Sequence, residues 1–125
     1  MAKLRLGYKV LRENDGNLIS STTDARETIY RFEEWTFPIE GAGPLAVFKS
    51  RKAARNHKKG LDYGTSITRR IFRCLYEPSR EVKVWWLNKK EGFTVGELES
   101  FAASGIVTPG HTRLAKRVFL FREDH

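Results

Sequence analysis

The sequence contains a single cysteine, few prolines and no long apolar run. Cys74 stands alone among 125 residues, which excludes an internal disulfide and any zinc motif that needs several cysteines. A lone thiol is typical of a reducing compartment, so we expect a cytoplasmic location. No segment approaches the ~18–20 apolar residues of a membrane span, and the first residues lack the apolar core of a secretory signal. We therefore expect no membrane partner.

Aromatic residues and positive charge are what the chain has in quantity. Eight Phe, three Trp and four Tyr contribute to an apolar fraction of 40%, which is sufficient for a compact core. A length of 125 residues fits one domain, and we interpret residues 1–125 as a single domain. The formal net charge of +8 is typical of proteins that bind polyanions.

The positive charge is concentrated in one segment. Between Lys49 and Arg73, Asp62 is the one acidic residue among many lysines and arginines. In the rest of the chain, basic and acidic residues are equal in number. A solvated helix face followed by an exposed loop would produce the same run of charge. The alternative is a surface that binds an anionic ligand.

Strand patterns dominate the chain. Asp15-Gly16 supplies the positive φ angles of a type I′ turn and predicts a hairpin. Alternation and short apolar runs predict strands over 7–12, 18–21, 29–35, 45–48, 68–76, 82–87 and 113–122. We expect 68–76 and 82–87 to form a second hairpin. The order of the predicted elements along the chain indicates an α+β fold, with a mainly antiparallel sheet of about 6–7 strands.

Two helices are predicted beside this sheet. The main one covers about 51–59, with Ser50 as its N-cap and Gly60 as its stop. A shorter one covers about 95–104, because Thr94 begins a capping box. The residues of the main helix that would face the sheet at helical spacing are Ala53, Ala54, His57 and Leu61.

The sequence shows no pattern for a metal, a cofactor or a nucleophile. His57, His111 and His125 lack the spacing of metal ligands. No glycine-rich phosphate loop is present, and we expect no cofactor. Cys74 shares a strand face with two aromatic residues, which favours a buried thiol over a reactive one. Glu33 and Glu34 would point to opposite sides of a strand and form no catalytic pair unless the chain bends there.

Anion binding is the chemistry that the residues favour. Arginine binds phosphate oxygens two at a time, and aromatic rings stack on bases. The adjacent Trp85 and Trp86 must point to opposite faces of a strand. The candidate cations are Arg51, Arg55, Lys58, Lys59, Arg69, Arg70 and Arg73, with a further basic row at Arg113, Lys116 and Arg117. The candidate stacking residues are Trp35, Tyr63 and Trp86.

Five stretches carry a resemblance to a known group of sequences. They are GYKVLR at 7–12, YRFEEWT at 30–36, GPLAVFKS at 43–50, IFRC at 71–74 and PGHTRLA at 109–115. On these the chain resembles a group of small uncharacterised proteins met in phages and in large-virus or metagenomic sequences. The resemblance implies a small viral domain in the host cytoplasm that acts by binding, including counter-defence against the host.

The residues and the resemblance lead to one leading hypothesis and two alternatives. The first is a non-enzymatic protein that binds a phosphate-bearing ligand, either a nucleotide or a short nucleic acid. The second is a general RNA- or DNA-binding domain that uses the same basic helix. The third is a small nucleotide-processing enzyme in which Glu34 or Asp24 acts as acid or base.

Overall fold

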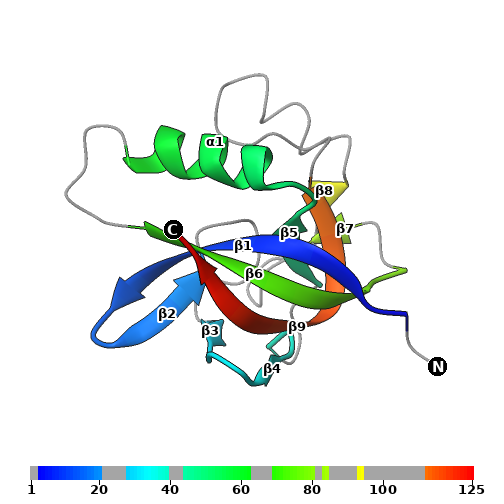
Figure 1. Ribbon diagram of the computed structural model, residues 1–125. Coiled ribbons are helices and arrows are strands. Elements are labelled where there is room, and N and C mark those ends of the chain that lie inside the picture. The colour runs from blue at the N-terminus through cyan, green and yellow to red at the C-terminus, as the bar shows by residue number, and fades with distance from the viewer. Residues whose placement is uncertain are drawn as a thin grey trace.

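The computed structural model describes residues 3–20, 28–39, 44–62, 69–80, 83–84, 93–94 and 112–125 (Figure 1). Nine strands and one helix lie within these residues. They are β1 (Arg5–Asn14), β2 (Asn17–Ser20), β3 (Ile29–Tyr30), β4 (Trp35–Thr36), β5 (Leu45–Phe48), α1 (Arg51–Asp62), β6 (Arg69–Pro78), β7 (Lys83–Val84), β8 (Phe93–Thr94) and β9 (Thr112–Asp124).

Four antiparallel strands close on themselves. β1 pairs with β5 along one edge and with β6 along the other, and β9 pairs with the same two strands. The ring β1–β5–β9–β6 is therefore a small barrel, in which each strand has a neighbour on both sides. The α+β class and the antiparallel pairing are confirmed, and the closure of the sheet is a feature that the sequence analysis did not predict.

Three short strands extend the ring. β2 continues from β1 through the predicted turn, where Asp15 and Gly16 have φ angles of 53° and 81°. β3 pairs with β2, and β4 pairs with β9. In Figure 1, β3 and β4 lie below the barrel while α1 lies above it. The candidate tryptophan on β4 and the candidate cations of α1 therefore lie on different sides of the molecule.

The barrel interior is mainly apolar, and a lysine is buried within it. Lys9 is fully buried there, and its Nζ donates a hydrogen bond to the Ala46 carbonyl oxygen at 2.5 Å. The same Nζ lies 5.0 Å from the centre of the Tyr30 ring. The apolar residues of this cluster are Leu11, Tyr30, Leu45, Val47, Phe72, Cys74, Tyr76, Ala115, Val118 and Leu120.

A second apolar cluster holds α1 on the outside of the barrel. The predicted inward face of the helix is confirmed for Ala53, Ala54 and His57, which are all buried. The His57 ring lies 4.9 Å from the ring of Phe48. The residues that form this cluster are Val10, Phe48, Ala53, Ala54 and Ile71, with Tyr8 packed against them.

Two predicted element boundaries are wrong. α1 continues through Gly60 to Asp62, because Gly60 keeps a helical φ and the Asp62 carboxylate receives a hydrogen bond from Lys58 one turn earlier. The predicted strand 29–35 is broken into β3 and β4. Glu33 has a φ of 60°, and its N–H donates to the Leu120 carbonyl at 2.8 Å, so the chain turns there.

The predicted pairing of 68–76 with 82–87 is also wrong. Both edges of β6 are occupied, by β1 and by β9, and β7 instead pairs with β8 in a separate two-stranded sheet. β6 therefore pairs with the distant strands β1 and β9 instead of forming a hairpin with the segment that follows it. The predicted helix over 95–104 lies outside the described residues.

Candidate functional site

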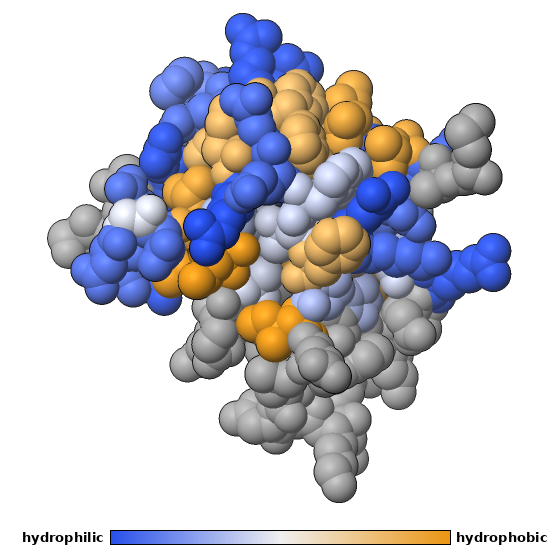
Figure 2. Space-filling model, turned by 90° about the horizontal axis from the view of Figure 1, so that it is seen from below, coloured by the Kyte–Doolittle hydropathy of each residue, from blue (hydrophilic) through white to orange (hydrophobic). Residues whose placement is uncertain are grey.

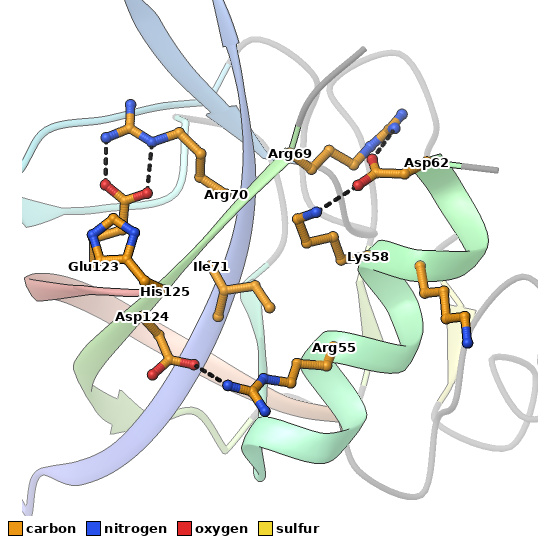
Figure 3. Close-up of a pocket in the computed structure, with 10 residues that line it drawn as sticks. Arg55, Lys58, Asp62, Arg69, Arg70, Ile71, Glu123, Asp124 and His125 are labelled. Carbon is orange, nitrogen blue, oxygen red and sulfur yellow. Dashed lines mark hydrogen bonds and ion pairs between the residues drawn. The ribbon is translucent and has the colours of Figure 1, made fainter. Parts of the chain in front are cut away.

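A pocket of about 780 Å³ lies between α1 and the adjoining ends of β6 and β9 (Figure 3). Ile71 lies at its base, and charged side chains from the three elements surround it. Its volume is in the range of small-molecule sites, roughly 300–1,000 Å³. Its cations are Arg55, Lys58, Lys59, Arg69 and Arg70, and its carboxylates are Asp62, Glu123 and Asp124.

The helix presents its cations because its start and its inner face are fixed. Ser50 Oγ accepts a hydrogen bond from the Ala53 N–H at 3.2 Å, which confirms Ser50 as the predicted N-cap. With Ala54 and His57 buried against the strands, the basic positions of the helix point toward solvent and toward the pocket.

Asp62 connects the end of α1 to the beginning of β6. Its Oδ2 accepts a hydrogen bond from Lys58 Nζ at 2.7 Å, and its Oδ1 accepts one from Arg69 Nη1 at 3.0 Å (Figure 3). Desolvation raises the pKa of the Asp62 carboxyl, but the two hydrogen bonds and the two nearby charges outweigh it and lower the pKa overall. Lys58 and Arg69 thus share one counter-ion.

Arg70 is held by a two-pronged contact. Its Nε and Nη2 donate to the two oxygens of Glu123 at 3.0 and 2.5 Å, and its Nη1 donates to Glu13 at 3.2 Å. The Glu123 hydrogen bonds raise the pKa of Arg70, and the same bonds lower the pKa of the Glu123 carboxyl. The guanidinium fork that would bind a phosphate is therefore already occupied by a carboxylate.

Asp124 lies between two arginines of α1. Arg51 Nη2 is 3.1 Å from its Oδ1, and Arg55 Nη2 is 3.9 Å from its Oδ2. The Asp124 side chain is only 8% exposed, whereas Arg51 and Arg55 are 44% and 54% exposed. The aspartate is thus an internal counter-ion, and Arg55 is held loosely by it.

The charge of the pocket is smaller than the sequence indicated. Glu123 and Asp124 belong to the C-terminal strand, and the pairing of β6 with β9 places them opposite Phe72 and Ile71. Five Lys and Arg side chains against three carboxylate side chains leave the lining with a formal excess of two positive charges. A count of charge along the chain does not reveal these two acids as neighbours of the basic segment, because register across strands decides which charges meet.

The remaining candidate residues do not all lie in the pocket. Lys59 lines the pocket and is exposed, but Arg73 lies farther along β6 on the outer face of the barrel. Trp35 lies on β4, where its ring packs 5.3 Å from that of Phe119, away from α1. The pocket therefore does not unite Trp35 with the cations of α1. Tyr63 and Trp86, like Trp85 and Asp24, lie outside the described residues.

The positions of Cys74 and of the Glu33–Glu34 pair do not favour reactivity. Cys74 is fully buried in the barrel, and burial raises the pKa of its thiol to about 12, so the thiolate is scarce at neutral pH. Glu33 and Glu34 lie at the bend between β3 and β4 and are both exposed. Glu34 is in a long ion pair with Arg31 at 3.9 Å.

Acid is expected to weaken the fold through Asp62 and Glu123. The pKa values of both carboxyls are lowered in the folded state. Their contribution to the free energy of unfolding is therefore complete above the ordinary carboxyl pKa of about 4 and is lost as the pH falls further. Thermal unfolding followed between about pH 6 and pH 2 should show a falling melting temperature. Glu123→Gln should flatten that dependence, and the exposed control Glu34→Gln should not. An unchanged slope in Glu123→Gln would contradict the assignment.

Comparison with protein-family models, with curated proteins and with solved structures gives no match for this chain. Within the described ranges, no three His, Cys, Asp or Glu side chains gather in a way that could hold a metal ion. The same part of the chain contains no helix with both the length and the apolar character that a bilayer crossing requires.

Proposed function

We propose that the protein binds a phosphate-bearing ligand, a nucleotide or a short nucleic acid, in the pocket between α1 and the ends of β6 and β9, without catalysing its turnover. One observation carries the proposal: five cations and three carboxylates surround a concave site of nucleotide size. The excess of positive charge attracts an anion, and the concave shape removes part of that anion from water.

The cations of this pocket would have different roles. Lys59 is exposed and has no ion pair with another described residue, and the Arg55 contact to Asp124 is long at 3.9 Å. These two side chains are free to turn toward a phosphate at little cost. Lys58, Arg69 and Arg70 are held by Asp62 and Glu123, so they supply positive potential from fixed positions.

The biological use that we propose follows from the resemblance to phage proteins. A small basic protein that holds a phosphate-bearing molecule without turning it over would sequester that molecule. In an infected cell, the molecule would be a phosphate-bearing signal of the host, and its removal would counter the defence that the signal controls.

A matched pair of charge reversals tests the pocket. Lys59 and Lys52 are both exposed residues of α1, but Lys52 lies about 10 Å earlier along the helix and does not line the pocket. We expect Lys59→Glu to weaken ATP binding about tenfold or more in isothermal titration calorimetry, because a charged contact is worth ~1.5–3 kcal/mol. Lys52→Glu should weaken it much less.

The two variants should melt within a few degrees of the natural protein, since each substitution is on the surface. Equal losses of ATP affinity in Lys59→Glu and Lys52→Glu would mean that the helix attracts anions only through its overall charge. Absence of ATP and oligonucleotide binding at ~150 mM salt in the natural protein would remove the proposed function.

A further inference from the structure

An apolar row crosses the outer face of four neighbouring strands beyond the area that α1 covers. Strand register places Leu6 of β1 beside Leu75 of β6, Leu75 beside Phe119 of β9, and Phe119 beside Trp35 of β4. Leu6 is 61% exposed and the other three side chains are half-buried. Figure 2 shows several apolar areas on the lower side of the molecule, with hydrophilic side chains between and around them. Contiguous exposed apolar surface marks a binding site more often than chance.

Two arginines lie opposite each other next to this row. Cys74 pairs with Leu120 while Arg73 pairs with Arg122, so a β-bulge sets both Phe121 and Arg122 against Arg73. Like charges across a strand pair repel. Neither arginine has an ion pair with any residue in the described part of the chain. The arginines of the pocket, by contrast, have carboxylate partners. An anion placed between Arg73 and Arg122 would replace their mutual repulsion by attraction to both.

A third arginine lies over the ring of the tryptophan of the row. The Arg117 guanidinium carbon is 4.1 Å from the centre of the Trp35 ring, and its Nε donates to Glu77 Oε1 at 2.9 Å. Lys116 Nζ is 3.6 Å from the other oxygen of Glu77. The guanidinium is thus fixed by a ring behind it and a carboxylate at its edge. A guanidinium plane held in this way is a surface on which a nucleic-acid base can stack.

We propose that this outer face is a second binding site, specific for single-stranded nucleic acid. Phosphates lie between Arg73 and Arg122, and bases stack on the rings of Phe119 and Phe121 and on the guanidinium of Arg117. None of these residues lines the pocket beside α1, so this site does not depend on phosphate binding there.

The occupant follows from the alternation of rings and unpaired positive charge. A run of phosphates joined to flat bases complements that pattern, and only unpaired bases expose the faces that rings can stack on. A second copy of the chain fits less well, because face-to-face docking would bring two such arginine pairs into one interface. One carboxylate on this face, Glu77, is already paired with Arg117 and Lys116.

Fluorescence anisotropy with labelled dT12 and U12 tests the site. Arg122→Gln should reduce the slope of log K against log salt by ~0.7, the value for one phosphate contact on a single strand. Phe121→Leu keeps apolar bulk but removes the ring, and should weaken binding about tenfold. Lys52→Gln removes one positive charge from α1 outside both sites and should leave oligonucleotide affinity nearly unchanged. A duplex of the same length should bind more weakly than either single strand.

Several results would overturn the proposal. They are equal affinity for the duplex and the single strands, an equal loss of affinity in Lys52→Gln and Arg122→Gln, or unchanged affinity in both Arg122→Gln and Phe121→Leu. Light scattering that shows a dimer disrupted by Leu6→Ser, together with no oligonucleotide binding, would assign the face to self-association instead. ATP titration of Arg122→Gln separates the two sites, because the pocket should bind ATP normally in that variant.

Discussion

Replacing Lys9 by alanine is expected to destabilise the protein by about 2–5 kcal/mol, the range for truncating a long side chain in a packed core. The residue is fully buried inside the barrel, so the missing atoms leave a cavity between closely packed strands. The substitution also leaves the Ala46 carbonyl without the hydrogen bond that Nζ donates. Urea unfolding followed by circular dichroism measures the change in the free energy of unfolding.

Lys9→Met separates volume from charge at this position. Methionine fills most of the same space but cannot donate a hydrogen bond, and an apolar replacement for a buried charge is often tolerated. We expect Lys9→Met to cost about 1.5 kcal/mol or less. If methionine destabilises the barrel as much as alanine does, the polar contacts of Nζ are what the interior needs, and the argument from volume is wrong.

Truncating Phe48 is expected to have a comparable effect and to act on the pocket as well. Phe48 is 1% exposed and lies between the barrel and α1, where its ring contacts that of His57. Phe48→Ala should cost about 3–5 kcal/mol, because it empties the cluster that holds the helix. Since α1 carries Arg55, Lys58 and Lys59, any ATP binding should weaken in the fraction that stays folded.

Phe37→Ala is the matched control, because Phe37 is 59% exposed and its truncation opens no cavity. Chemical denaturation should show a change within about 0.5 kcal/mol for this variant. Similar losses of stability in Phe48→Ala and Phe37→Ala would show that α1 does not depend on the cluster beneath it. Loss of ATP binding without loss of stability in Phe48→Ala would place the residue in the site itself.

Local sequence determined the elements whose causes are local. Asp15-Gly16 specified the turn between β1 and β2, because those residues tolerate positive φ angles. Ser50 specified the beginning of α1, and the spacing of Ala53, Ala54 and His57 specified its buried face. The alternation in β6 correctly predicted that Cys74 is buried with Phe72 and Tyr76, but it did not predict that Ile71, on the opposite face, is buried under α1. The antiparallel α+β class follows from these patterns together.

Tertiary structure alone decided how distant strands meet. β9 pairs with both β5 and β6, so residues more than 50 positions apart become neighbours, as Arg70 and Glu123 do. No local pattern encodes that register, since a strand with alternating residues can pair with several partners. The same pairing sets Arg73 against Arg122 while it neutralises much of the basic row beside α1. The sequence by itself determined how much charge the protein carries, whereas the closure of the barrel decided which of those charges are paired, because ion pairing depends on distance in space.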